Sequence, residues 1–178
     1  SFLPARANEQ IYNNATEGSK IIYISLYAGL LPAGAGKSHQ SLRDISAISN
    51  IPNFKIFHPS TNIQLSKILN HCVYKEKSNC LIRLHVGQNY FSDEIFGKNF
   101  NLKIGVGNSI NNKSNFAILC YGQLMLKQAI RLNNQIKKFN FEIINFTCLN
   151  SFNLKWVKKI LKNKKYVFIF DEHNKSGG

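Results

Sequence analysis

The sequence predicts an α/β fold made of two consecutive domains, each a parallel sheet between helices. Apolar runs of strand length, such as 21–25 and 80–84, alternate with segments whose apolar residues recur every three or four positions. A second strand–helix series of the same kind starts near residue 116. Because parallel strands need crossover helices, this alternation is typical of parallel sheets covered on both faces.

The first series opens with a helix that begins close to Pro4. Strand 21–25 leads into a loop, then into a short helix that we expect to be capped near Ser41, and then into a second strand. Ser60 or Thr61 can cap the next helix, which precedes strand 80–84. The apolar and small positions of the two longer helices are Ala7, Ile11 and Ala15 in one, and Leu65, Ile68, Leu69 and Cys72 in the other.

The stretch 86–114 is rich in glycine and asparagine, which predicts a linker in which a small hairpin could form. Strands are then expected at 116–120, 141–146 and 166–170, and a helix at 153–162. Between the first two of these strands, a helix carries Met125, Ala129, Leu132 and Ile136 on one face.

The formal net charge of +14 makes nucleic acid the first partner to consider. The lysines are spread along helices and turns, however, and no nucleic-acid-binding module accompanies them. The densest group, Lys155, Lys158, Lys159 and Lys162, repeats at three and four residues, as on the solvated face of an amphipathic helix. We therefore expect no nucleic-acid partner.

The four cysteines, Cys72, Cys80, Cys120 and Cys148, show no paired short spacing and fall in or beside apolar segments. This pattern predicts buried, reduced thiols and no zinc or other metal site. The longest apolar runs are of strand length, so no membrane partner is expected either. With no signal peptide apparent, the expected location is the cytoplasm or an organelle stroma.

The loop after strand 21–25 is the strongest candidate for a functional site. It carries glycines, which let the backbone approach a ligand closely, and it adds His39 and Arg43 at the same edge of the sheet. Its Gly-Lys-Ser sequence at 36–38 also suggests a phosphate-binding P-loop. That pattern requires a glycine where the chain has Leu31, and no strand ending in a convincing magnesium-binding aspartate follows, so this alternative is weaker.

Several separated motifs in this region occur in the order found in one known family. They are Ser-His-Gln at 38–40, Asp-Ile at 44–45, Ile-Pro-Asn at 51–53 and Pro-Ser at 59–60. Together they resemble the pyrimidine-binding domain of the transketolase family, most closely 1-deoxy-xylulose-5-phosphate synthase and the split transketolases. The segment 171–178 is similar to part of the family's C-terminal domain. The resemblance implies a pyrimidine-binding domain over 1–88, a linker over 89–114 and an incomplete C-terminal domain over 115–178.

The resemblance also implies roles for four residues. His39 matches the family's histidine for proton transfer or for holding a substrate oxygen, and a pKa near neutral suits that work. Phe2 matches the ring that stacks on the cofactor's aminopyrimidine, and Arg6 and Arg83 match arginines near the substrate phosphate. From the residues alone, Phe2 could be core and Arg6 a solvated charge. Arg83 lies inside an apolar strand, so it could equally form a core ion pair.

Family members are transferases that use thiamine diphosphate with Mg²⁺. The resemblance implies that both are held largely by a diphosphate-binding domain or subunit outside this sequence, in a homo- or heterodimer, and that this chain by itself is incomplete and inactive. The expected substrate is a phosphorylated sugar or a 2-oxo acid. Two alternatives remain: a beta-type subunit of a 2-oxo-acid dehydrogenase, and a catalytically degenerate assembly protein. Ala35, where the family usually has an acidic residue, favours the latter. The transketolase histidine is also missing near Tyr27, and both departures leave the identity of the substrate open.

Overall fold

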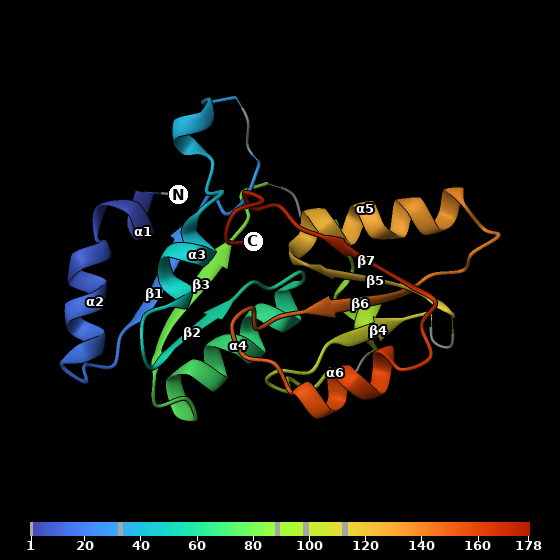
Figure 1. Cartoon of the computed structure of the whole chain (residues 1–178). Coiled ribbons are helices and arrows are strands. Elements are labelled where there is room, and N and C mark those ends of the chain that lie inside the picture. Colours follow the sequence, from blue (N-terminus) through green and yellow to red (C-terminus); the bar gives the residue numbers. More distant parts are fainter. Residues whose placement is uncertain (1, 32–33, 88–89, 98–99, 112–113) are drawn as a thin grey trace.

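A computed structural model describes residues 2–31, 34–87, 90–97, 100–111 and 114–178 (Figure 1). The first part of the chain contains α1 (Phe2–Arg6), α2 (Asn8–Thr16), β1 (Ile22–Leu26), the 3₁₀ turn η1 (Lys37–His39), α3 (Asp44–Ser49), β2 (Phe54–Phe57), α4 (Asn62–Tyr74) and β3 (Asn79–Leu84). The second part contains η2 (Asp93–Phe96), β4 (Asn108–Ile110), β5 (Phe116–Tyr121), α5 (Gly122–Gln135), β6 (Glu142–Phe146), α6 (Leu154–Leu161) and β7 (Tyr166–Phe170). The α/β fold class is confirmed.

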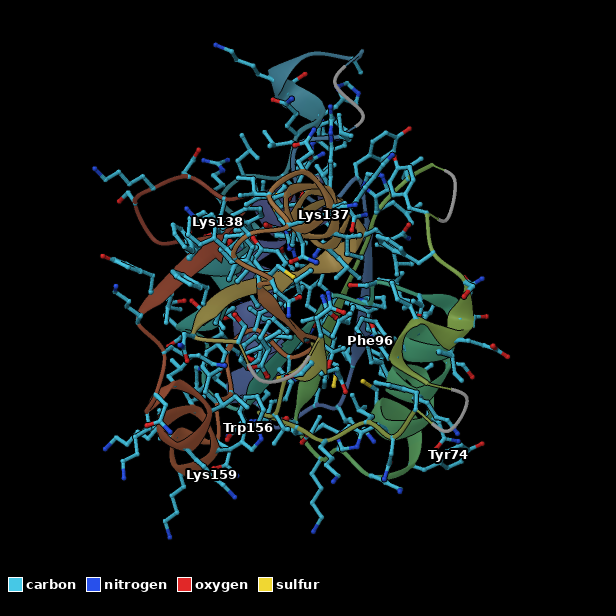
Figure 2. All side chains as sticks on the ribbon, turned by 90° about the vertical axis from the view of Figure 1, so that its right-hand side faces the viewer. Tyr74, Phe96, Lys137, Lys138, Trp156 and Lys159 are labelled. Atoms are coloured by element: carbon cyan, nitrogen blue, oxygen red, sulfur yellow. The ribbon has the colours of Figure 1, made fainter. Side chains whose placement is uncertain are left out.

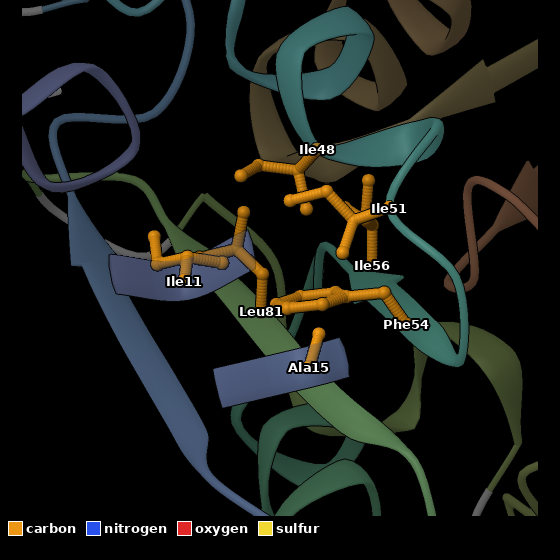
Figure 3. Close-up of a cluster of buried hydrophobic side chains, with 7 residues drawn as sticks. All are labelled: Ile11, Ala15, Ile48, Ile51, Phe54, Ile56 and Leu81. Atoms are coloured by element: carbon orange, nitrogen blue, oxygen red, sulfur yellow. The ribbon is translucent and has the colours of Figure 1, made fainter. Parts of the chain in front are cut away.

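The first sheet has the strand order β1-β3-β2, and all three strands are parallel. One face packs against α2 and α3, and the cluster in Figure 3 is made of Ile11, Ala15, Ile48, Ile51, Phe54, Ile56 and Leu81. The opposite face packs against α4 through Ile68 and Cys72. Alternate residues of β3 therefore serve two cores, as the continuous apolar run of a central parallel strand requires.

The second sheet has the order β4-β6-β5-β7, in which β4 is antiparallel to β6 and the other pairs are parallel. Helix α5 covers one face through Met125, Leu126 and Ala129, and α6 packs on the other through Trp156. The expectation that both faces are covered is wrong for the edge strand β7. Residues 166–169 are each more than a third exposed, because β7 lies at the margin of the sheet.

Several local expectations need correction. Ser41 does not cap a helix: it exchanges two backbone hydrogen bonds with Gly29 in an extended conformation, and α3 begins only at Asp44. The helix near Pro4 is interrupted at Ala7, so that α1 and α2 are separate. Within the stretch expected to be a linker, β4 pairs with β6 as an edge strand of the second sheet. Ile136 falls just beyond α5 and is 38% exposed, rather than inside the helix.

Thr61 is the residue that caps α4, because its hydroxyl accepts a hydrogen bond from the Gln64 amide at 3.3 Å. All four cysteines are free and buried, as predicted. The lysine face of α6 is exposed, and Figure 2 shows Lys159 at the periphery of the molecule. No helix within the described ranges has the length and apolar character needed to cross a membrane.

The two sheets are joined directly where their strands end. The His58 amide donates to the Thr147 carbonyl at 2.9 Å, and the Leu149 amide donates to the Ile56 carbonyl at 2.8 Å. The side chain of Asn150 bridges further, accepting from the Ile56 amide and donating to the backbone of β2. The segments after β2 and β6 are therefore held side by side, which brings the carboxyl ends of both sheets together.

Candidate functional site

The candidate site is built on the loop between β1 and α3, which projects beyond the sheets at the top of Figure 1. Its base is closed by Gly29 and Ser41, whose amides and carbonyls exchange hydrogen bonds at 3.2 and 3.0 Å. Gly29 has φ +78°, a conformation that glycine adopts without steric cost. The glycine-rich sequence thus makes a narrow neck, and η1 holds His39 beyond it.

Three of the four residues predicted to form the site lie together. The rings of Phe2 and His39 meet edge to face, with their centroids 4.9 Å apart. The guanidinium carbon of Arg6 lies 4.4 Å from the centroid of the Phe2 ring, and the Tyr27 ring lies 6.3 Å from His39. Helix α1 and the loop after β1 are separated in sequence, so their packing brings an aromatic ring, a cation and a titratable ring to one place.

A cleft of about 1100 Å³ opens beside this group. Its lining includes the cations Arg6, Lys37 and Arg43, together with Phe2. The one acidic residue in the lining, Asp44, is buried and already paired with an arginine. The described surface of the cleft is therefore positively charged and suited to an anion.

The P-loop alternative does not fit this geometry. Lys37 starts a 3₁₀ turn of three residues, and the next helix begins only at Asp44. A P-loop needs a helix N-terminus directly after its lysine and serine to hold phosphate. Part of the motif, residues 32–33, lies outside the described residues. Ala35, where the family pattern has an acidic residue, occupies an exposed turn.

Arg83, the fourth predicted site residue, lies apart from the other three and is completely buried. Its guanidinium donates to both carboxylate oxygens of Asp44, at 2.8 and 3.1 Å, and to Nδ1 of His58 at 2.8 Å. Burial by itself lowers the pKa of Arg83, but the adjoining Asp44 carboxylate outweighs burial and raises it. Of the two interpretations open from the sequence, this geometry favours the core ion pair.

The buried polar groups around Arg83 were not predicted from the sequence. His58 is fully buried, and burial and the Arg83 charge lower its pKa well below the usual value. Glu172 follows β7, and one of its carboxyl oxygens lies 3.8 Å from His58 Nδ1. Two glycines leave room for these side chains, since a Cβ on Gly29 would overlap the Glu172 carboxyl group and one on Gly122 would lie 2.6 Å from the His58 ring.

The residues of the site fit only part of a thiamine cofactor. Phe2 offers an aromatic ring at the edge of the cleft, and His39 offers a titratable nitrogen beside it. No cluster of three or more histidine, cysteine, aspartate or glutamate side chains that could hold a metal ion occurs among the residues described. The arrangement suits an aromatic ring and an anion, and the residues described supply no ligand cluster for a divalent metal.

Comparison with known proteins shows the family to which the chain belongs. Residues 1–90 match the family described as the transketolase pyrimidine-binding domain. The chain belongs to the transketolase family. Its curated relatives include 1-deoxy-D-xylulose-5-phosphate synthases from Natranaerobius thermophilus, 23% identical over 180 residues, and from Campylobacter jejuni, 25% identical over 184 residues. Both alignments include the whole chain, which spans 28% and 29% of the length of these relatives.

Solved structures of the transketolase family share the fold. A structure described as a split gene transketolase, an inactive beta4 tetramer, superposes with a TM-score of 0.82 at 20% identity, over 99% of this chain and 56% of that one. A transketolase from Campylobacter jejuni superposes with a TM-score of 0.71 at 15% identity, over 97% of this chain and 31% of that one. The fold of the transketolase family therefore extends over both sheets of the chain.

Proposed function

We propose that the chain is a section of a thiamine diphosphate-dependent, transketolase-like transferase that acts on phosphorylated sugars or 2-oxo acids. The observation that carries the proposal is the convergence of Phe2, Arg6 and His39 beside a cationic cleft. The relatives, which are synthases and transketolases, support the same class of reaction. The chain's short span of these relatives supports a role as one section of a larger assembly, formed with a diphosphate-binding domain or subunit.

Each residue of the group has a distinct role in this proposal. Arg6, with Lys37 and Arg43 in the same lining, holds the phosphate of the substrate, since cations in a cleft bind anions in ground and transition states alike. His39 exchanges a proton with a substrate oxygen or holds that oxygen. The Ser38 hydroxyl lies 3.1 Å from His39 Nδ1, where it can fix the tautomer and leave Nε2 for the substrate.

Phe2 contributes a wall for the aminopyrimidine ring of the cofactor. When bound, thiamine diphosphate supplies the nucleophilic carbon and the electron sink for breaking a bond next to a carbonyl. We assign the diphosphate and its Mg²⁺ to the partner domain, because the resemblance implies a diphosphate-binding domain and the chain spans only 28% of the length of a relative that it matches. For Arg83 we propose a supporting role, in which its ion pair fixes Asp44 at the wall of the cleft.

A second candidate function is assembly without catalysis. It is favoured by Ala35, which stands on an exposed turn where the resemblance implies an acidic residue. A structural neighbour described as an inactive beta4 tetramer is consistent with a chain of this fold that associates with its own copies. In this case the cleft residues have no substrate to act on.

The test combines the chain with the separately expressed diphosphate-binding section of a split transketolase, with thiamine diphosphate and Mg²⁺ present. We expect transfer activity from the mixture, and no measurable binding of thiamine diphosphate and Mg²⁺ by the chain alone in calorimetry. Arg6→Ala should raise KM for phosphorylated substrates about tenfold and leave kcat nearly unchanged. His39→Ala should lower kcat by about 10²-fold or more.

Arg131→Ala on the exposed side of α5 is the matched control and should leave both constants unchanged. Micromolar, magnesium-dependent cofactor binding by the isolated chain would contradict the proposal that the partner section binds the diphosphate and Mg²⁺. A stable complex in which neither the wild-type chain nor its variants support transfer would instead favour the assembly function.

A further inference from the structure

The segment 171–174, just after β7, touches the loop of the first domain at both of its ends. The carboxyl group of Glu172 lies against Gly29 so closely that a Cβ at that glycine would overlap it. Farther along, the Asn174 amide donates to the Leu42 carbonyl at 2.9 Å, on the other side of the neck. A short piece of the second domain therefore spans the base of the loop that carries His39.

The Glu172 side chain is buried at this junction but has few hydrogen-bond donors. Glu172 is 2% exposed, and no described side chain donates a hydrogen bond to either carboxyl oxygen. The three Arg83 nitrogens are already engaged, two by Asp44 and one by His58. A buried carboxyl group with so few hydrogen-bond donors costs folding free energy, and it is nevertheless held against Gly29.

We propose that Glu172 is a positioning residue that holds the neck of the His39 loop, and so links the second domain to the candidate site. Its catalytic meaning rests on the proposed function, whereas its effect on the loop does not. Gly29 is hydrogen-bonded through its backbone to Ser41, so a side chain that packs against Gly29 restrains both segments of the neck. If the Glu172 carboxyl group moved away, Gly29 and Ser41 would lose this restraint, and the position of His39 relative to Phe2 could change.

The charge on Glu172 provides a way to vary this contact without mutation. Burial raises its pKa to about 7, against the opposing influence of Arg83 and the Leu30 amide. The other charged or titratable groups that face it are His58, Asp44, Asp171 and Tyr121. Asp44 and Asp171 disfavour ionisation. Near neutral pH the group therefore begins to carry a buried charge with few hydrogen-bond donors, and the contact at Gly29 should loosen.

The experiment is amide hydrogen exchange on the 178-residue chain, followed at Ser41 and across 34–43. Glu172→Ala should speed exchange in this loop about tenfold, and Glu172→Gln, which keeps the shape of the protonated group, should change it less than about twofold. Glu142→Ala is the matched control, since Glu142 is 3% exposed in the same domain but pairs with Lys164 away from the loop. It should leave exchange in 34–43 unchanged.

In the wild type, loop protection corrected for intrinsic exchange should fall as the pH rises from about 4.5 to about 7 and should level off above that range. Glu172→Gln should remove that dependence. Equal loop exchange in the wild type and Glu172→Ala, or equal acceleration by Glu142→Ala, overturns the proposal. If Glu172→Ala does not fold, a flat wild-type pH profile overturns it on its own. Because exchange needs neither substrate nor cofactor, failure of the transferase assay leaves this result standing.

Discussion

The Asp44–Arg83 pair, which links α3 to β3, offers the sharpest test of how Arg83 is held in the interior. Asp44→Asn keeps the shape of the side chain but removes its charge from a guanidinium that is 0% exposed. Two short hydrogen bonds to a carboxylate, at 2.8 and 3.1 Å, become contacts to a neutral amide. The Arg83 charge then faces a neutral amide and the ring of His58, whose pKa lies well below its usual value.

Removing one partner of a buried ion pair costs about 3–5 kcal/mol, because the remaining charge stays desolvated. Asn retains one acceptor oxygen, so we expect the lower end, about 3 kcal/mol. For a chain of this length 1 kcal/mol corresponds to about 2–4 °C, which gives a fall in Tm of about 6–12 °C. This is a large fraction of the 5–15 kcal/mol typical of a folded domain.

The assay is urea and thermal unfolding of the wild type, Asp44→Asn and the exposed control Glu17→Gln. The double variant Asp44→Asn/Arg83→Met should be less destabilised than the sum of the single variants, since it removes the stranded charge. An Asp44→Asn protein within about 0.5 kcal/mol of the wild type would refute the reasoning. It would show that Arg83 is not held as a buried cation and would favour its alternative role at a substrate phosphate.

Three further predictions concern stability. Burial raises the pKa of Glu76, but hydrogen bonds from the Ser78 amide and hydroxyl and the Lys77 amide outweigh it and lower the pKa to about 2. The stabilisation by ionised Glu76 is fully present above the ordinary carboxyl pKa and is lost as the pH falls toward 2. Glu76→Gln should therefore lower the free energy of unfolding by about 1 kcal/mol at pH 7. It should also make this free energy depend less on pH between about pH 4.5 and 2. Thr61→Ala should cost about 1–2 kcal/mol of stability by removing the cap of α4, whereas Thr61→Ser keeps the hydroxyl and should lose little. An unchanged urea midpoint in Thr61→Ala would contradict the role of Thr61 as a cap. Gly122→Ala should cost about 2 kcal/mol or more, because φ is +65° and the new Cβ would lie 2.6 Å from the buried ring of His58, and a neutral effect in thermal unfolding would show that this ring can move.

The sequence alone determined most of what is local in this protein. Helix α4 has its capping threonine and its apolar residues at helical spacing, and β3 is apolar over 80–82 and at Leu84, so both were predictable from the sequence pattern. The separated motifs around His39 determined the family, because several residues in one order are far more specific than a glycine loop. A separate resemblance in the segment 2–11 led to Phe2 and Arg6, which the fold then brings within contact of His39 or of one another.

Only the tertiary structure decided how the two sheets meet. Asp44 lies in α3 and Arg83 in β3, whereas residues 58 and 172 lie in the segments after β2 and β7. Periodicity predicts which face of an element is buried, but not which separate segments are buried together. For that reason the sequence left Arg83 open between a substrate phosphate and an ion pair, and gave no sign that Glu172 would rest against Gly29. The exposure of β7 could not be predicted from the sequence either, because an apolar run has the same pattern in a central strand and in an edge strand.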